Sequence, residues 1–430
     1  MSSTVRTAKE LKVALDSGEQ DIVLQGTIAG MPMVTLPPGV TLRGGLLRFG
    51  GRGIQVTTDN TLTDLRIEVP DTEAAVLTDP TVSTCGTLTL KNVTTSGQVA
   101  LIGEGKLVSG HVTAQSVHVQ TADVRGRFHR PHSYGVDALQ GAFTLWNRQP
   151  DPSSRLTAEL LDLRVGTADA PVRGSGVFIA GTPGGGVVVV SELTTGPVST
   201  DGGIASDTPD VISGGVFVVT GATVDVVENL GPVTTFGQND MVLDNWGVVS
   251  EWSVRDRVVS RGPSGIGFVN FGDLGTLTVD GVVETFGVGA RGFNLYDGTV
   301  RNSATFESIR THGDGAVGVQ LSRPLRRLVV RGDLSTSGSI GTSLVKGMQT
   351  ELEAMELSVQ AGGSIAELDV GGQISTAGAG VATVEILGEL RRATVRGGIH
   401  ATGDGSRTVR SAGRVAALDG VDLRPPPPAA

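Results

Sequence analysis

The sequence has little of several residue types that usually mark a function. It contains a single cysteine, Cys85, so neither an internal disulfide framework nor a cysteine-based zinc site can form. Aromatic residues make up only 4% of the chain, and lysine is scarce relative to arginine. The core therefore has to be built from Val, Leu, Ile, Ala and Thr, which suit β-strands.

Long apolar runs are also missing. No stretch reaches the roughly 18 apolar residues of a membrane-spanning helix, and residues 1–20 lack the apolar segment of a secretory signal peptide. The net charge of −10 argues against a nucleic-acid partner, because binding to phosphates needs a basic surface. We therefore expect a soluble protein with no nucleic-acid or membrane partner, and a cytoplasmic location by default.

Motifs for cofactor and metal chemistry are weak. The glycine-rich segment "GTPGGGVVVV" lacks the Lys-Ser/Thr pair of a phosphate-binding loop, and no G-x-S-x-G nucleophile motif occurs. His129 and His132 could supply two metal ligands, but no third ligand at a recognised spacing accompanies them. We expect no cofactor and no metal site.

Glycine is abundant instead, with 63 residues. The chain begins with one helical pattern, in which Thr7 and Glu10 fit a capping box and Gly18 can end the helix. Strand-like segments then follow one another along the chain. A modest helical pattern at 349–357 is the exception among them.

An internal repeat organises the second half of the chain. Glycines recur with spacings of 25, 25, 26 and 25 residues, then 40, then 25. These glycines are Gly237, Gly262, Gly287, Gly313, Gly338, Gly378 and Gly403. The spacing of 40 indicates either an insertion of about fifteen residues or one irregular repeat between 339 and 377.

The residues that follow each glycine repeat as well. The sixth residue after it is apolar in every copy, and the seventh is mostly polar. The sixth residues are Leu243, Phe268, Phe293, Val319, Leu344, Val384 and Val409. Because side chains alternate across a strand, this pattern predicts one strand per repeat with the same face inward each time.

A repeat of about 25 residues without helices has room for three short strands and three turns, which is one coil of a parallel β-helix. The sequence therefore predicts an all-β fold, a right-handed parallel β-helix solenoid with a short N-terminal capping helix. We expect a cap at 1–20, a single β-helix domain at 21–423 and a proline-rich tail at 424–430. The alternative, a β-sandwich with antiparallel hairpins, predicts no fixed 25-residue register.

The chain resembles the pectin-lyase-like right-handed β-helix superfamily. The resemblance rests on the helical segment "TAKELKVALDSG", the strands "DIVLQGTI" and "MVTLPPGVTLRGG", and the coil length. It is a resemblance of architecture that includes no catalytic motif. It implies a capped solenoid whose long outer face binds, and in some members cleaves, polysaccharides, although a fold alone does not carry a function over.

An outward aromatic column is expected on the coils at 237–322. If the sixth residue after each glycine points inward, the seventh and ninth point outward, so aromatic side chains of successive coils stack. Sugar rings lie on aromatic planes while their hydroxyls bond to polar side chains, which predicts a substrate-binding surface. Its members are Trp246, Phe271 and Tyr296, with Asp244, Asn294 and Gln320 beside them. The alternative is a structural ladder that a loop covers.

The stretch "RGRFHRPHSYGVD" (125–137) gathers residue types that are rare elsewhere in the chain. Its proline and glycine make it a loop or wide turn. Histidine titrates near neutrality, aspartate can orient it, and arginine can neutralise a sugar carboxylate. The candidate catalytic residues are Arg127, His129, Arg130, His132, Tyr134 and Asp137. The structural alternative is that the arginines pair with acidic neighbours and the histidines fill a polar loop.

Together these features favour a protein that recognises a polysaccharide or other extended glycan. Its enzymatic version is a lyase or hydrolase that acts on an acidic glycan. The alternative is a non-catalytic structural or adhesive β-helix that self-associates as a homo-oligomer through the aromatic column. An enzyme of small-molecule metabolism stays open, although no motif favours it.

Overall fold

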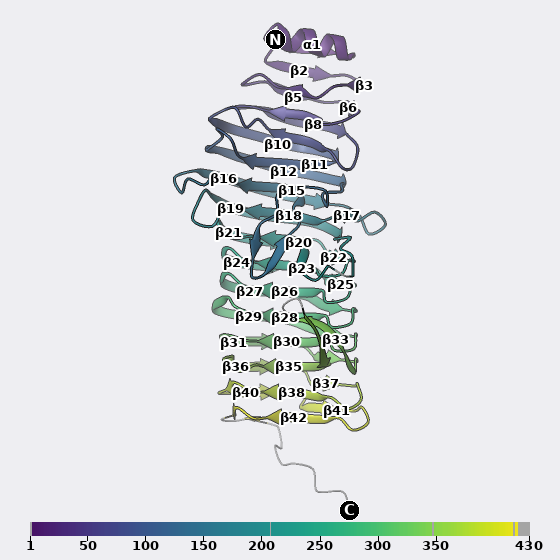
Figure 1. Cartoon of the computed structure of the whole chain (residues 1–430), viewed down its shortest axis with the longest axis vertical. Coiled ribbons are helices and arrows are strands. Elements are labelled where there is room, and N and C mark those ends of the chain that lie inside the picture. The colour runs from purple at the N-terminus through teal and green to yellow at the C-terminus, as the bar shows by residue number, and fades with distance from the viewer. Residues whose placement is uncertain (1, 207, 346–347, 416–417, 420–430) are drawn as a thin grey trace, which may run out of the picture. The chain divides into compact units, whose positions relative to one another are not determined.

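The structure is a computed structural model, and it describes residues 2–206, 208–345, 348–415 and 418–419 (Figure 1). Its contacts divide the chain into two compact units, Met1–Ser250 and Glu251–Ala430. In each unit most strands pair in parallel with a strand of the next coil, which confirms the predicted all-β parallel β-helix. The expected single domain at 21–423 stays a prediction, and the tail at 424–430 lies outside the described residues.

The N-terminal cap is helix α1 (Ala8–Asp16). The Glu10 backbone N–H donates to the Thr7 hydroxyl (3.2 Å), and the Glu10 carboxylate accepts from the Arg6 backbone N–H (2.6 Å). These two bonds satisfy donors that a helix start leaves free. Leu11 and Ala14 form its buried side. Among the described residues, no helix combines the length and apolar character that crossing a membrane requires.

Unit 1 arranges its coils in two sheets and one small hairpin. Sheet A holds β1 (Ser3–Val5), β2 (Asp21–Leu24), β3 (Thr27–Met31), β5 (Thr41–Arg43), β6 (Leu46–Phe49), β8 (Thr61–Glu68), β10 (Thr84–Ser96), β12 (Ser109–Thr121), β16 (Arg155–Val165), β17 (Val172–Arg173), β19 (Val187–Asp201), β21 (Ala222–Asn229), β22 (Val233–Thr235) and β24 (Val248–Val254), whose last residues belong to unit 2. Sheet B holds β4 (Val34–Thr35), β7 (Ile54–Val56), β9 (Ala74–Thr78), β11 (Gln98–Gly103), β15 (Gly141–Asn147), β18 (Ser175–Ala180), β20 (Val211–Val218) and β23 (Asp240–Asn245). The hairpin is β13 (His132–Ser133) with β14 (Val136–Ala138).

The core of unit 1 is built from columns of apolar side chains in register from coil to coil. In one column of sheet A, each residue is the pairing partner of the next, and none is more than 2% exposed. The column consists of Leu62, Leu90, Ala114, Leu160, Leu193 and Val227. Each coil thus buries its apolar face against the coils on either side of it.

Unit 2 repeats this plan with coils of 25 or 26 residues, as in the pairing of Arg291 with Ile266 and with Val317, whereas the first coils of unit 1 hold 20, as in the pairing of Asp21 with Thr41. Sheet A holds β25 (Val258–Ser260), β27 (Asp273–Thr285), β29 (Thr299–Thr311), β31 (Pro324–Val330), β32 (Leu334–Thr336), β36 (Ser364–Val370), β37 (Ile374–Thr376), β39 (Glu389–Leu390), β40 (Ala393–Val395), β41 (Ile399–Ala401), β43 (Arg414–Val415) and β44 (Leu418–Asp419). Sheet B holds β26 (Ile266–Asn270), β28 (Arg291–Leu295), β30 (Val317–Leu321), β35 (Met355–Val359), β38 (Ala382–Ile386) and β42 (Arg407–Ser411). A separate hairpin pairs β33 (Ile340–Val345) with β34 (Met348–Glu353).

The predicted inward positions of sheet B form one buried column in unit 2. Phe268, Phe293 and Val319 are paired in register and fully buried. The next residue in the column is Leu357, not the predicted Leu344. Leu344 belongs to β33, because the additional residues between 339 and 377 come directly after the repeated glycine.

The repeated glycines stack on one another. A Cβ atom added to Gly287, Gly313, Gly338, Gly378 or Gly403 would lie within 2.0 Å of the carbonyl oxygen of the preceding glycine in the series. No side chain fits at such a distance. The 25-residue spacing therefore records a column in which the backbones of successive coils come into close contact.

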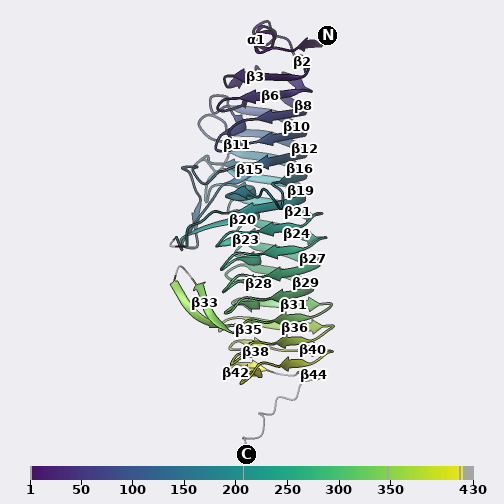
Figure 2. The ribbon, with the colours of Figure 1, turned by 90° about the vertical axis from the view of Figure 1, so that its right-hand side faces the viewer.

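The long interval after Gly338 is explained by the hairpin β33–β34, which stands away from the stacked strands (Figure 2). Residues 349–357, where the sequence has a modest helical pattern, form parts of β34 and β35 instead of a helix. The hairpin is thus a local addition to an otherwise regular unit.

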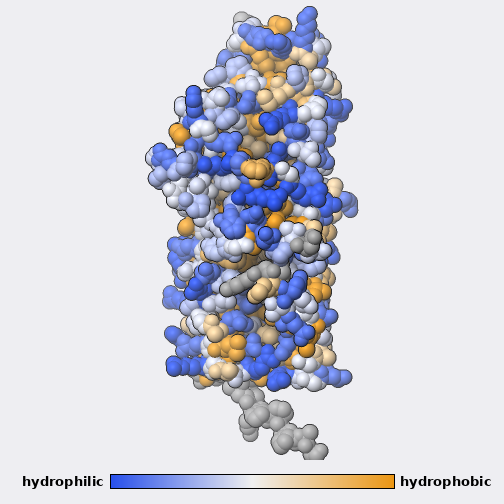
Figure 3. All heavy atoms as spheres, viewed as in Figure 1, coloured by the Kyte–Doolittle hydropathy of each residue, from blue (hydrophilic) through white to orange (hydrophobic). Residues whose placement is uncertain are grey.

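On the face shown in Figure 3, hydrophilic side chains predominate and apolar ones are scattered between them.

Candidate functional site

The stretch 125–137 leaves the coils of unit 1 as a loop that ends in the β13–β14 hairpin. Tyr134 and Gly135 form its two-residue turn, both with positive φ (54° and 83°). This is the backbone geometry that tight hairpins favour. On its other side β14 pairs in parallel with β20, through Asp137 with Val211 and Ala138 with Ile212. The hairpin is therefore an added piece of sheet beside the coils.

The hairpin brings two of the candidate catalytic residues together. His132 Nδ1 lies 2.8 Å from Asp137 Oδ1, and the two residues face each other across β13 and β14. Both side chains are well exposed, at 65% and 42%. A carboxylate bound to Nδ1 fixes the orientation of the imidazole, which is the arrangement of a histidine that exchanges protons with a ligand.

Tyr134, at the tip of the hairpin, packs on Trp246. The ring centroids are 5.3 Å apart at 76°, and Trp246 in turn meets Phe217 edge to face at 4.8 Å. Trp246 is only 3% exposed. The expectation that Trp246 presents an open face to a sugar is therefore wrong. The same burial removes it from the surface that self-association through the aromatic column would need.

Two further candidate catalytic residues, His129 and Arg130, make contacts within the loop and with the residues that follow it. The His129 carbonyl accepts a bond from Gln140 Nε2 (2.9 Å), and its ring meets Phe128 edge to face. Arg130 Nη2 donates to the Arg125 carbonyl (2.8 Å). These contacts lie within the loop and the segment next to it, and the partner of Arg130 is a backbone carbonyl instead of the acidic neighbour that the structural alternative expected.

Arg127 lies at an open pocket of about 570 Å³. The side chain is half-buried, and its Nε and Nη2 atoms are buried without a hydrogen-bond partner. Burial lowers the pKa of the guanidinium, an effect that the negative charge of Glu73 opposes and the positive charge of Arg52 reinforces. Glu73 also lines the pocket. The pocket thus contains a cation whose hydrogen-bonding capacity is not used up.

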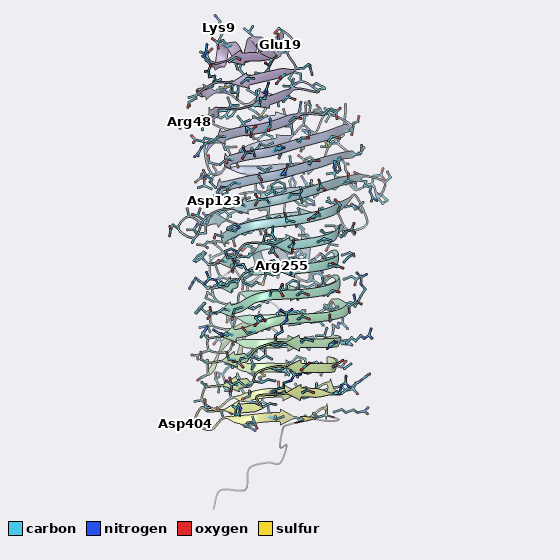
Figure 4. All side chains as sticks on the ribbon, turned by 180° about the vertical axis from the view of Figure 1, so that it is seen from behind. Lys9, Glu19, Arg48, Asp123, Arg255 and Asp404 are labelled. Carbon is cyan, nitrogen blue, oxygen red and sulfur yellow. The ribbon has the colours of Figure 1, made fainter. Side chains whose placement is uncertain are left out.

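The rest of the pocket is also charged. Arg125 binds Asp123 with two bonds of 2.7 and 2.9 Å, and its hydrogen bonds lower the pKa of that carboxyl (Asp123 is labelled in Figure 4). Beyond it, Arg173 pairs with Asp201 at 2.5 Å. The charged residues of the pocket lining are therefore two arginines, Arg125 and Arg127, and two carboxylates, Glu73 and Asp123.

Aromatic residues of unit 1 form a chain of edge-to-face contacts that is buried except for Tyr134, which is 46% exposed. Trp146 meets Phe178 at 6.0 Å, and Phe178 meets Phe217 at 5.7 Å. Trp246 and then Tyr134 continue the chain. For Trp246 this agrees with the alternative of a ladder covered by a loop, although its other members differ from the predicted column. Asp244, directly before this region in β23, is also buried, and burial raises the pKa of its carboxyl well above the usual range.

In unit 2 two members of the predicted aromatic column, Phe271 and Tyr296, contact each other. Phe271 and Tyr296 follow β26 and β28 directly, and their half-buried rings lie 4.9 Å apart, tilted by 38°. At that separation each ring covers part of the face of the other, so less aromatic plane is open to a sugar than predicted. Asn294 is 3% exposed, which places it beneath the surface.

The structure adds residues that sequence reasoning missed. Arg291 is 5% exposed and donates from Nε to Gln320 Oε1 (2.7 Å), and burial lowers its pKa to about 10. In sheet B it pairs between Ile266 and Val317, so an arginine in an otherwise apolar column was the available signal. Glu356 is another such residue, fully buried, with both carboxylate oxygens unpartnered.

Within the described ranges, no group of three or more His, Cys, Asp or Glu side chains is arranged to hold a metal ion. The structure joins His132 to Asp137 and gives Arg127 a pocket, while His129, Arg130 and Tyr134 contact other parts of the loop and coils. The chain was also compared with protein families, curated proteins and solved structures, and it matches no family model, no curated protein and no solved structure.

Proposed function

We propose that unit 1 binds an acidic polysaccharide and that Arg127 is the residue that holds a carboxylate of the sugar chain. The observation that carries this proposal is the unpartnered guanidinium at an open pocket. Arginine matches a carboxylate with two parallel hydrogen bonds, which makes the pair both strong and specific in direction.

The free-energy penalty for burying the Arg127 guanidinium without hydrogen-bond partners supports a role in binding. A buried donor without a partner costs about 1–3 kcal/mol, and a desolvated charge costs more. The guanidinium atoms Nε and Nη2 carry this penalty in the structure. A carboxylate that bonds to these two atoms offsets the penalty, and because both atoms are buried this requires the guanidinium to turn toward the pocket.

The neighbouring groups fit the rest of a uronate sugar. Arg125 adds a second cation at the pocket, and the carboxylates of Glu73 and Asp123 can accept hydrogen bonds from hydroxyls. We also propose that the chain is a member of the pectin-lyase-like superfamily, and the parallel β-helix architecture supports this.

Cleavage is the enzymatic form of the proposal. Its support is the lowered pKa of Arg127 at the pocket and, on the same loop but outside the pocket lining, the imidazole of His132 bonded to Asp137. A lyase needs one group that neutralises the uronate carboxylate and one that takes the proton from the neighbouring carbon. The ultraviolet absorbance of the unsaturated product distinguishes such an enzyme from a binding protein.

The test is affinity electrophoresis and titration calorimetry with pectate, alginate and glycosaminoglycan oligosaccharides. Replacing Arg127 by glutamine is expected to weaken binding tenfold or more, because a hydrogen bond to a charged group contributes about 1.5–3 kcal/mol. Arg155→Gln is the matched control, since Arg155 is an exposed arginine of the same unit that does not line the pocket.

The thermal stability of the variants separates binding from misfolding. Arg127→Gln removes a desolvated cation, so its melting temperature is expected to equal or exceed that of the unmodified protein. The proposal fails if none of the acidic oligosaccharides binds, or if Arg127→Gln and Arg155→Gln bind equally well.

A further inference from the structure

Unit 2 contains a cleft of about 320 Å³ between the β33–β34 hairpin and the outer side of sheet B. Its floor is a row of polar side chains from successive strands, Gln320, Ser358, Glu385 and Arg410, which pair in register. Its wall consists of hairpin residues. Neither the 25-residue repeat nor the pocket around Arg127 accounts for this cleft.

The hairpin that makes the cleft is the departure from the glycine spacing. Such insertions in repeat proteins cluster on the face that binds ligands. The hairpin is held in place through Glu353, which accepts bonds from Arg410 Nη1 (2.7 Å) and from the Ala382 backbone N–H (3.1 Å). The cleft therefore has a fixed wall on a rigid floor, as a preformed site requires.

The charges of the cleft exclude an anionic ligand. Arg410 lies between two carboxylates, since it also donates to Glu385 Oε1 from Nε (2.8 Å). Its positive charge is thus neutralised within the protein. Glu351 adds a third carboxylate to the lining. Three carboxylates against one guanidinium leave the cleft negative, whereas the pocket around Arg127 has two arginines and two carboxylates.

The polar groups of the cleft are those that bind hydroxyls. The oxygen of the Gln320 amide is engaged by Arg291, so its NH₂ group is the part left for a ligand. Ser358 Oγ accepts from Gln360 Nε2 (2.6 Å), which leaves its own hydroxyl hydrogen to donate. Leu352 and Met355 supply apolar surface in the same cleft.

We infer that this cleft binds a neutral saccharide of one or two sugar rings. Carboxylates accept pairs of sugar hydroxyls, the amide and hydroxyl groups donate to ring and hydroxyl oxygens, and Leu352 with Met355 contacts the apolar side of the ring. The volume lies at the lower end of the range for small-ligand sites, which is about 300–1,000 Å³. The site is independent of the acidic-glycan pocket in position and in charge.

Saturation-transfer NMR with a panel of neutral mono- and disaccharides tests the inference on the full chain. At least one sugar is expected to show saturation transfer. Glu351→Gln is expected to weaken that sugar about tenfold, because it replaces a charge-assisted hydrogen bond with a neutral one. Glu19→Gln is the control, a half-buried glutamate that follows the N-terminal helix and does not line the cleft.

A deletion gives a second, independent variant. Removing residues 341–353 joins Ile340 to Ala354 and puts Leu357 six residues after Gly338, as in the other coils. This variant is expected to lose saccharide binding completely while it keeps the binding of acidic oligosaccharides. If the deletion variant does not fold, Glu351→Gln and Glu19→Gln still decide the question.

Two results would overturn the inference: no saturation transfer from any neutral sugar, or equal affinity of Glu351→Gln and the control. Acidic oligosaccharide titrations on the same samples report on Arg127 alone. Failure of one proposal is therefore visible without failure of the other.

Discussion

At the scale of single residues, buried acids make the stability of this protein depend on pH. Asp240 begins β23 and is fully buried. Burial raises its pKa to about 7, although the Gly202 backbone N–H (3.0 Å) and the Thr200 hydroxyl (3.1 Å) both donate to the carboxylate and oppose the rise. In the unfolded chain the same carboxyl titrates near pH 4.

Because its folded pKa is raised, Asp240 contributes its full share of stability below about pH 4 and loses it as pH rises from there to about 7. The loss amounts to roughly 4 kcal/mol for a shift of this size. Asp240→Asn cannot titrate, so its denaturant midpoint relative to the unmodified protein is expected to rise between pH 4.5 and pH 7.5. A midpoint difference that stays constant across this range would contradict the assignment.

At the scale of elements, the β13–β14 hairpin acts as a cover. Tyr134 at its tip packs on Trp246, which is 3% exposed, and the two other tryptophans are buried as well, at 6% for Trp146 and 1% for Trp252. Tryptophan fluorescence of the native protein is therefore expected to be protected from a soluble quencher.

Replacing Tyr134 by alanine uncovers one side of Trp246. The variant is expected to show a red-shifted emission and stronger quenching by acrylamide, since the indole then meets water. Phe128→Ala is the control, because Phe128 is 91% exposed on the same loop and its ring contacts His129. Equal quenching of both variants would mean that the hairpin does not shield Trp246.

The glycine column belongs to the same scale, because it joins each coil to the next. A Cβ on Gly313 would lie 2.0 Å from the Gly287 carbonyl oxygen, so Gly313→Ala forces the two backbones apart. We expect a destabilisation of at least about 2 kcal/mol, seen as a lower melting temperature. Gly126→Ala adds its Cβ in open space and is expected to change stability by less than about 0.5 kcal/mol.

At the scale of the whole molecule, the sequence predicted the length of the repeated coil and its inward side chains. It did not predict which loops cover the outer face of the coils. The spacing from Gly237 to Gly338 identified the coil length, and the inward positions of Phe268, Phe293 and Val319 followed from side-chain alternation. Both rest on contacts between adjacent coils, which repeat and are therefore visible as a period. The long interval after Gly338 also located the inserted hairpin.

The parts that failed depend on contacts that do not repeat. Alternation predicts that Trp246 points outward, but Tyr134 of the loop at 125–137 packs on it and it is buried, and no spacing reveals which loop folds over which strand. Leu344 was assigned to the core because the interval of 40 does not say where the additional residues stand within it. Arg291 was missed because a single arginine at a position that is apolar in the neighbouring coils carries no repeated signal. Its bond to Gln320 is visible only in the structure.

The glycine column has a consequence for how such a chain changes in length. Each glycine lies against the glycine one coil before it and against the residue next to that glycine. A segment of 25 residues with its glycine in phase can therefore be gained or lost as a block wherever no contact between particular coils, such as that of Arg291 with Gln320, is broken. The number of coils in a unit can thus change by duplication. Each added coil moves the coils on its two sides apart by roughly 4.8 Å.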